Sequence, residues 1–207
     1  MRYEKGHKEL TRKRILEIAS RRFRKEGIDA VGLASLMSDA GLTHGGFYNH
    51  FKSKEELVAA ALADSFQEPA GKPNERASTE KYGALERFVR TYLHPKHRDN
   101  PDKGCAIAAA ATEIARHSES TRKVIDEKIE KLLTYIGENL PTDFSAEEKR
   151  QTAMNIFSVL VGALQLSRIT LDREKSDQIL QGGIAAALAL AAKADVKRIG
   201  RKIPAPA

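Results

Sequence analysis

Apolar residues recur at helical spacing along nearly the whole chain, and this pattern constrains the fold more than any other feature. Near the amino terminus Ile15, Ile18, Ala19 and Phe23 follow the spacing of an amphipathic helix, and Gly27 provides a stop. No segment alternates between apolar and polar residues in the way that a half-buried strand requires. The sequence therefore predicts an all-α protein.

Glycine, proline and capping residues divide this pattern into successive helices. Gly41 suits the left-handed end of one helix, and Thr43 can cap the start of the next. Ser53 and Glu56 have the spacing of a capping box. The expected helices cover residues 9–26, 33–40, 44–51, 54–66, 80–93, 104–116, 119–139, 146–171 and 175–194.

The composition excludes several classes of protein. The chain has 207 residues, of which 41% are hydrophobic, enough to form a packed core. Its single cysteine, Cys105, cannot form an intramolecular disulfide, and the amino terminus is too polar for a secretory signal. The longest uncharged stretches fall short of the roughly 20 apolar residues of a membrane span. We therefore expect a cytoplasmic protein that is not inserted in a membrane.

The positive charge is concentrated in the first quarter of the chain. The formal net charge is +7, and through Lys54 there are 12 Lys and Arg residues against 6 Asp and Glu residues. This asymmetry indicates a nucleic-acid-facing module joined to a nearly neutral body, although a solvated charged face would show the same excess.

Two short predicted helices joined at Gly41 form a helix-turn-helix candidate. The run GLTHGGFYNHFKSKEEL, which ends at Leu57, closely resembles the signature of the TetR/AcrR family of transcriptional regulators. The stretch TRKRILEIA, which begins at Thr11, together with Phe23 and Gly27 is similar to that family's first helix. The resemblance implies a three-helix DNA-binding domain, a linking helix, and a larger helical domain with an effector pocket and a homodimer interface.

The domain boundaries follow from this comparison and from one polar stretch. Residues 68–79 (EPAGKPNERAST) are rich in Pro, Gly and polar residues and mark the main boundary. We expect the helix-turn-helix DNA-binding domain at 1–54, the linking helix at 55–67, the ligand-binding and dimerisation domain at 68–195, and a basic flexible tail at 196–207.

The candidate DNA-binding residues lie in and beside the third predicted helix. The positive end of this helix and the Thr43 hydroxyl suit a phosphate, and two successive glycines let the backbone approach the major groove. Tyr48 can donate its hydroxyl to a phosphate, whereas Phe47 and Phe51 are expected to face the core. The full candidate set is Thr43, His44, Gly45, Gly46, Tyr48, Asn49 and Lys54.

The resemblance places an effector pocket among the helices that start near residues 80, 104 and 119. Their inner faces carry few charges, which favours an apolar or aromatic effector. Glu113 is the charged exception and a candidate partner for a polar group of that effector. The candidate lining residues, any of which can equally be ordinary core, are Phe88, Tyr92, Ile107, Ala111, Ile114 and Tyr135.

The last two predicted helices, 146–171 and 175–194, are the candidates for the homodimer interface. Their apolar faces are long and rich in small residues, which allow close approach of helices. An intramolecular core is the alternative explanation of the same pattern. The candidate interface residues are Ile156, Leu160, Leu164, Ile184 and Leu188.

Together with the family resemblance, these observations predict a ligand-responsive transcriptional regulator. We expect a repressor that binds a pseudo-palindromic operator in double-stranded DNA as a homodimer and leaves it when a small-molecule effector binds. The chain contains none of the common catalytic sequence motifs, so we do not expect an enzyme. No cofactor is expected, and no metal site, because Pro95 interrupts any helix between His94 and His97. The alternative is a helical small-molecule-binding or redox-sensing module, built around Cys105, without specific DNA binding.

Overall fold

The computed structural model describes residues 2–65 and 83–192, and every regular element in these two ranges is helical. The boundary predicted at 68–79 and the tail predicted at 196–207 lie outside the described residues. The elements are α1 (Arg2–Glu26), α2 (Leu33–Asp39), the 3₁₀ helix η1 (His44–Asn49), α3 (Lys54–Ser65), α4 (Gly83–Tyr92), α5 (Pro95–Asp99), the 3₁₀ helix η2 (Pro101–Lys103), α6 (Ala106–Ile114), α7 (Glu119–Glu138), α8 (Ala146–Ile169) and α9 (Arg173–Ala191).

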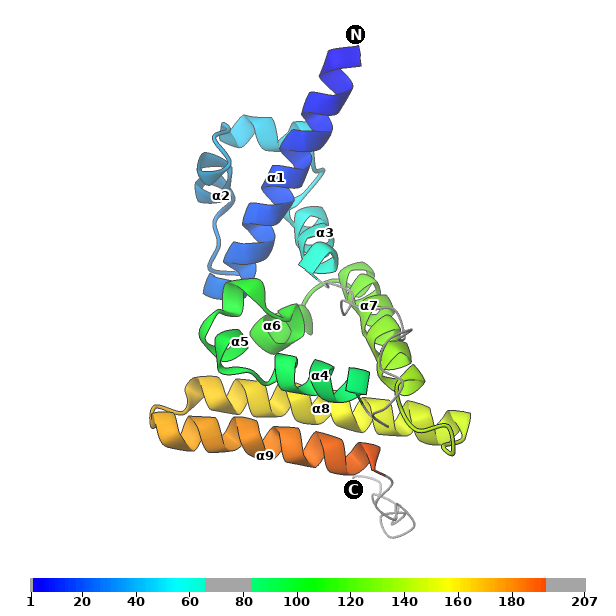
Figure 1. Ribbon diagram of the computed structural model, residues 1–207. Helices are drawn as coiled ribbons and strands as arrows, with labels where there is room; N and C mark the ends of the chain where they lie inside the picture. Colours follow the sequence, from blue (N-terminus) through cyan, green and yellow to red (C-terminus); the bar gives the residue numbers. More distant parts are fainter. Residues whose placement is uncertain (1, 66–82, 193–207) are drawn as a thin grey trace, which may run out of the picture.

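The helices are arranged in three levels, as Figure 1 shows. One end holds α1, α2, η1 and α3, here called the N-terminal unit. The other end is formed by α8 and α9, which lie side by side along their length. Between them lie α4 to α7, which together with α8 and α9 are called the C-terminal unit. The region resembling a DNA-binding domain therefore stands on the middle helices and away from α8 and α9.

The turns of the N-terminal unit form as the sequence predicts. Gly27 and Gly41 have left-handed φ angles of 94° and 66°, which a residue with a side chain rarely adopts. The backbone N–H of Leu42 donates to the carbonyl of Met37 at 2.9 Å and closes the end of α2. The Thr43 hydroxyl accepts the backbone N–H three residues later at 3.3 Å. The predicted helix-turn-helix corner is confirmed.

Two apolar cores hold these levels together. The first is built from the N-terminal unit, but Ala106, Ala110 and Ile114 of α6 and Ile125 of α7 belong to it as well. The second lies among α4, α7, α8 and α9. Because burial of apolar surface is the main driving force of folding, the shared first core fixes the N-terminal unit onto α6 and α7.

One residue interrupts α6. Ala110 has φ −139° and ψ 24°, which is outside the helical region, although the residues on both sides are helical. Ala110 is buried in the first core, whereas Ala108 belongs to the second core. The helix therefore contributes to both cores on the amino-terminal side of this break, and to the first core after it.

Two short helices, α5 and η2, were not expected from the sequence. Pro95 and Pro101 are typical helix breaks, but each stands in the first turn of one of these helices. A proline is tolerated there because the first N–H groups of a helix have no partner inside the helix. The third predicted helix is also shorter than expected, since η1 ends at Asn49 and is a 3₁₀ helix.

The residues predicted at the homodimer interface lie inside the single chain instead. Ile156, Leu160 and Leu164 have no exposed surface, and Ile184 is 7% exposed. Leu188 is half-buried and packs against the same core. Ile156, Leu160 and Leu164 are therefore core residues of the chain itself, because α8 and α9 turn these side chains toward each other and toward the helices above them. Contact of Ile184 and Leu188 with a second copy stays a prediction.

Among the described residues, α8 is the one helix long and apolar enough to cross a membrane. Several of its apolar side chains, including Phe157 and Leu160, are buried in the second core. Burial of this kind is typical of the central helix of a helical bundle, and the length of α8 is explained by its packing along α9.

Candidate DNA interface

The short helix η1 presents polar side chains above a base of two packed phenylalanines. Tyr48 is 63% exposed, and His44 and Asn49 are exposed as well. Phe47 and Phe51 are buried, and their stacked rings have centroids 5.6 Å apart. The buried rings fix the orientation of η1, so its opposite face is free to meet another molecule.

The two glycines of η1 leave the backbone bare between His44 and Phe47. A Cβ atom added to Gly45 would meet no heavy atom within 4 Å, and one added to Gly46 would meet the Thr43 hydroxyl at an ordinary 3.5 Å. The fold therefore does not require glycine at either position. A flat backbone surface is what close approach to the wall of a DNA groove requires.

Lys54 is placed differently from the sequence expectation. Its ammonium is half-buried and donates to the backbone carbonyl of Ile28 at 3.1 Å, so it holds the loop after α1. Its contact with DNA stays a prediction. The remaining candidates in and beside η1 are brought together on one end of the molecule.

Sequence reasoning missed His50, the residue that ends η1. Its Nδ1 atom is buried and has no hydrogen-bond partner among the described residues. Burial lowers the pKa of His50, and the positive charges of Lys8 and Arg12 lower it further. His50 is half-buried and lies between the exposed Asn49 and the buried Phe51, at the edge of the candidate interface.

Arg22 holds α2 against α1 and so supports η1. Its guanidinium donates to Glu26 at 2.7 and 2.9 Å, to Asp39 at 2.9 Å and to Ser35 at 3.1 Å. An arginine with several acceptors on two helices fixes their relative position through directional charged hydrogen bonds.

A carboxylate of α6 joins the C-terminal unit to the loop after α1. Glu113 Oε2 accepts the backbone N–H groups of Ile28 at 2.5 Å and of Asp29 at 3.0 Å. A Cβ atom at Gly27 would lie 2.9 Å from Glu113 Oε1, so the missing side chain there gives the carboxylate room. Glu113 was a candidate partner for an effector, but it is occupied by this contact between the two units.

A second carboxylate makes the reverse connection, from α3 to the start of α7. Glu55 accepts from the hydroxyls of Thr121 at 2.6 Å and Ser118 at 2.7 Å, and Nδ1 of His117 lies 2.9 Å from its other oxygen. Burial alone would raise the pKa of Glu55, but these hydrogen bonds outweigh it and lower the pKa to about 2.

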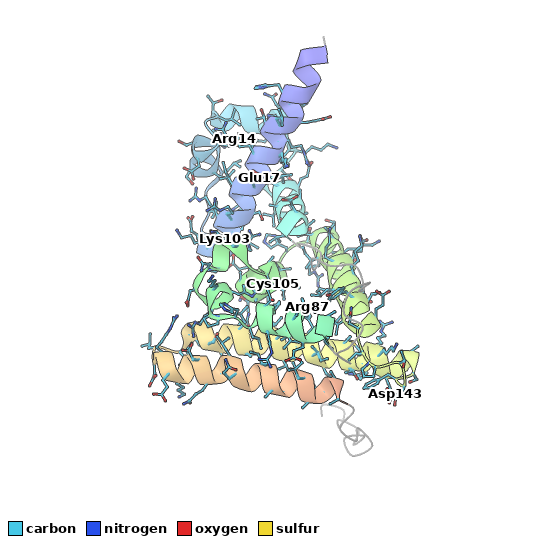
Figure 2. All side chains as sticks on the ribbon, in the orientation of Figure 1. Arg14, Glu17, Arg87, Lys103, Cys105 and Asp143 are labelled. Carbon is cyan, nitrogen blue, oxygen red and sulfur yellow. The ribbon has the colours of Figure 1, made fainter. Side chains whose placement is uncertain are left out.

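A third connection joins α1 to η2. The Arg24 guanidinium donates to the backbone carbonyl of Asp102 through two nitrogens, the longer bond being 2.9 Å, and Arg21 pairs with the Asp102 carboxylate at 3.3 Å. Figure 2 labels Lys103 and Cys105 beside this contact, at the level between α1 and α8. The N-terminal unit is thus held at η2, at the end of α6 and at the start of α7.

A hollow of about 640 Å³ lies between α6 and α7, next to two of these connections. Three predicted pocket residues, Ile107, Ala111 and Ile114, line it, and so do Ile125 and Ile129. Its volume is within the range of small-molecule sites. The charged residues at the hollow are Glu119, Arg122, Lys123 and Asp126.

The other three predicted pocket residues form an aromatic cluster away from this hollow. Phe88 lies 5.9 Å from Tyr92 and 5.7 Å from Tyr135, measured between ring centroids. The Tyr92 hydroxyl is buried beside the half-buried Cys105. Burial is the main cause that raises the pKa of Tyr92 well above its ordinary value, and the neighbouring thiol adds to it. The six predicted residues therefore belong to two separate places.

His94 and His97, the histidines on either side of Pro95, are engaged in contacts within the chain. His97 Nε2 accepts the backbone N–H of Cys105 at 3.0 Å, and its Nδ1 lies 2.6 Å from the carbonyl of Tyr92. His94 accepts the backbone N–H of Lys96 at 3.0 Å and caps α5. Across residues 2–65 and 83–192 no group of three His, Cys, Asp or Glu side chains is placed to hold a metal.

The fold and this interface define a helix-turn-helix DNA-binding protein. Residues 15–61 match the family described as bacterial regulatory proteins, tetR family. Residues 82–182 match the C-terminal domain of LmrA/YxaF-like transcriptional regulators. The chain belongs to the TetR family of transcriptional regulators, with a C-terminal domain of the LmrA/YxaF type. It is therefore a DNA-binding regulator and not an enzyme.

Individual relatives agree with this assignment. The chain is 26% identical over 167 residues to the uncharacterised HTH-type transcriptional regulator YxaF of Bacillus subtilis, covering 79% of this chain and 87% of YxaF. It is 43% identical over 68 residues to the HTH-type transcriptional regulator TtgR of Pseudomonas putida, covering 33% of this chain and 32% of TtgR.

Solved structures share the fold at lower identity. The reduced form of E. coli NemR matches with a TM-score of 0.70 and 20% identity, covering 86% of this chain and 94% of NemR. A TetR transcriptional regulator from Chloroflexus aurantiacus matches with a TM-score of 0.69 and 22% identity, covering 91% of this chain and 96% of the other.

The lowered pKa of Glu55 predicts a specific pH dependence of stability. The pKa falls from its ordinary 4.5 to about 2 on folding, so Glu55 stabilises the fold above pH 4.5 and loses this contribution as the pH falls toward 2. Because 40% of its side chain is exposed, solvent screening limits the contribution to about 1 kcal/mol. Urea unfolding between pH 7 and pH 3 measures it.

The matched variants are Glu55→Gln and Glu127→Gln, the latter at an exposed position in the middle of α7. We expect Glu55→Gln to be less stable at pH 7 and to lose less stability on acidification, while Glu127→Gln follows the original protein. Identical pH profiles for all three proteins would contradict the proposed role of Glu55.

Proposed function

We propose that the protein is a cytoplasmic, homodimeric repressor that binds a pseudo-palindromic operator and is released by a small apolar or aromatic effector. The observation that carries this proposal is the exposed polar face of η1 above the buried Phe47 and Phe51. The unit that holds η1 is joined to the C-terminal unit by Glu113 and Glu55. Membership of the TetR family establishes DNA binding. Repression, the dimer and release by an effector are the proposed parts.

The direct experiment is fluorescence anisotropy with two DNA duplexes of equal length at physiological salt. One duplex is selected by the protein from a random pool, and the other has the same bases in scrambled order. We expect the selected duplex to bind at least about 10³-fold more tightly, the lower end for specific regulators. Equal affinity for both duplexes would contradict specific operator binding.

Two substitutions in η1 test which groups meet the DNA. Tyr48→Phe removes a hydroxyl that we assign to a phosphate, so binding to both duplexes should weaken by a similar factor. Gly46→Leu should abolish specific binding by holding η1 off the groove, while the open surroundings of Gly46 leave the fold intact. Helical circular dichroism is the control. Unchanged affinity of either variant removes that residue from the interface.

The outward faces of α8 and α9 support the homodimer. Leu166 and Ile169 are 54% and 74% exposed, and a Cβ atom at Gly162 or Gly182 would meet nothing within 4 Å. Exposed apolar residues beside flat glycine positions are typical of a helix pair that packs on a second copy. This face, and not the buried residues named from the sequence, is the proposed interface.

Leu166→Glu tests this interface because it places a charge on the proposed contact. At micromolar concentration we expect the original protein to sediment as a dimer and the variant as a monomer with unchanged helical content. Leu10→Glu is the matched control, since Leu10 is 69% exposed but lies on α1. A dimeric Leu166→Glu variant would place the interface elsewhere.

The hollow between α6 and α7 is the proposed effector site. Its base is formed by isoleucines, which suit an apolar or aromatic body. Ile114 and Glu119 of the hollow lie next to Glu113 and Ser118, which take part in the contacts with the N-terminal unit. A ligand that separates α6 from α7 would therefore move both contacts and reorient the two copies of η1.

Glu113→Ala tests this coupling. A small molecule that releases the selected duplex is first found by screening, and operator affinity is then measured with and without it. Couplings of this kind are typically about 5- to 150-fold, and we expect the ratio to fall below about threefold in the variant. Glu127→Ala, at an exposed position on α7, should keep the original ratio. An unchanged ratio in Glu113→Ala would refute the coupling role.

A further inference from the structure

A short segment of the chain lies between the N-terminal unit and the pair α8 and α9. It comprises α5 and η2, residues 95–103, and is here called the bridge. Figure 1 shows α5 between the end of α1 and the α8–α9 pair. Both helices of the bridge begin with a proline, which presets φ in the first turn. The bridge is therefore a stiff piece of chain.

On one side the bridge is fixed to α9 by a buried arginine. The side chain of Arg98 is 3% exposed. Its guanidinium donates to the Asp177 carboxylate at 2.6 Å and to the Ser176 hydroxyl at 2.8 Å, both on α9. Asp99, the next residue of the bridge, accepts hydrogen bonds from two guanidinium nitrogens of Arg173 at 2.6 and 3.0 Å. Arginine–carboxylate contacts of both signs thus join α5 to the beginning of α9.

The bridge is fixed to α8 as well. Arg168 of α8 donates to the backbone carbonyls of His97 at 2.9 Å and Arg98 at 3.3 Å. Its third contact, to the carbonyl of Ala108 at 3.0 Å, holds the start of α6 with the same guanidinium. Because the N–H groups of a guanidinium have a rigid geometry, these contacts restrict direction as well as distance. Movement of the bridge relative to α8 or α9 therefore breaks charged hydrogen bonds.

On its other side the bridge is fixed to α1. The Arg24 guanidinium donates to the backbone carbonyl of Asp102, with its longer bond at 2.9 Å, and to the hydroxyl of Ser20 on α1 itself. Arg21 pairs with the Asp102 carboxylate at 3.3 Å. Since α1 shares the first core with Phe47 of η1, a fixed position of Asp102 also fixes η1.

The bridge differs in this respect from the other two connections of the N-terminal unit. In the proposed homodimer α8 and α9 form the base shared by both copies. The connection at η2 continues through charged hydrogen bonds to both of these helices. The contacts of Glu113 and Glu55 end on α6 and α7, which line the hollow. The distance from the shared base to η1 therefore depends most directly on the bridge.

We propose that the bridge determines which half-site spacing the homodimer accepts, with Arg24 and Arg98 as its positioning residues. This inference rests on the homodimeric operator binding proposed above and adds the determinant of spacing to it. Neither side chain touches DNA in this role. Each holds the N-terminal unit at one distance and one angle from α8 and α9, so that both copies of η1 reach major grooves about 34 to 36 Å apart, or a multiple of that.

The test uses duplexes that differ only in half-site spacing. The selected duplex is compared with versions that have one base pair inserted at or removed from the centre, which moves one half-site by about 3.4 Å and rotates it by about 35°. A rigid dimer then reaches one half-site only. If the two half-sites contribute equally to a preference of about 10³-fold, the shifted duplexes should bind the original protein about 30-fold more weakly.

Two variants of the full chain address the two ends of the bridge. Arg24→Met removes the contact with Asp102 and keeps an unbranched side chain. Its matched control is Lys25→Met, because Lys25 is the exposed neighbour on α1 and the variant loses the same charge. Asp177→Asn removes a charge from a side chain that is 52% exposed and keeps an acceptor oxygen for Arg98. Circular dichroism and sedimentation verify that each variant is folded and dimeric.

We expect Arg24→Met to bind the selected duplex about three- to tenfold more weakly, because a loosely held unit must be ordered on binding. Its discrimination against the shifted duplexes should fall from about 30-fold to below about tenfold, and Asp177→Asn should change it in the same direction. Lys25→Met should keep the original discrimination. An equal loss of affinity for all duplexes would show a purely structural role and overturn the proposal.

The original protein alone tests the homodimeric operator binding on which the inference rests. If it binds the selected and the shifted duplexes equally, that proposal fails and the bridge has no spacing to determine. If it discriminates, and both bridge variants are folded and dimeric and discriminate equally well, operator binding by a homodimer stands and only the role of the bridge is overturned. Should Arg24→Met not fold, Asp177→Asn decides by the same ratio.

Discussion

The carboxylate of Glu113, which meets the backbone after α1, sets the geometry of the junction between the two units together with the contacts of Glu55 and Arg24. Two N–H groups, from Ile28 and Asp29, converge on one oxygen, and such charge-assisted hydrogen bonds are stronger than neutral ones. Gly27 permits this contact in two ways. Its left-handed φ of 94° forms the turn, and the absence of a Cβ atom leaves room for the carboxylate. A larger residue at Gly27 would disturb both the turn and the connection to α6.

Glu113 and Glu55 connect the two units in opposite directions at the corner between α6 and α7. One carboxylate belongs to the C-terminal unit and binds the N-terminal unit, and the other does the reverse. The first core covers the same junction with apolar contacts from Ile114 and Ile125. Directional polar contacts set the geometry here, and apolar burial supplies most of the free energy. A change in the hollow between these contacts can therefore alter the relative position of the two units while their apolar contacts are kept.

Local sequence chemistry predicted the helices and turns well, because Gly41, Thr43 and Phe47 each act on their immediate neighbours. It could not assign an apolar face to a particular partner. The periodicity of Ile156 and Leu160 shows that one face is buried, but not whether the same chain or a second copy buries it. The roles of Glu113 and His50 were likewise hidden, because their partners lie far away in the sequence or on another helix. The DNA and effector contacts remain predictions that follow from this geometry.

The break in α6 at Ala110 has a thermodynamic consequence. On one side of it, Arg168 of α8 donates to the carbonyl of Ala108, and on the other side Glu113 holds the N-terminal unit. A change in φ and ψ at one residue can shift the two sides relative to each other while both cores stay packed. Reversing a 1:99 population requires a ligand to prefer one state by about 5.5 kcal/mol. A ligand that acts through this break would have to supply that preference but would not also have to compensate for lost packing.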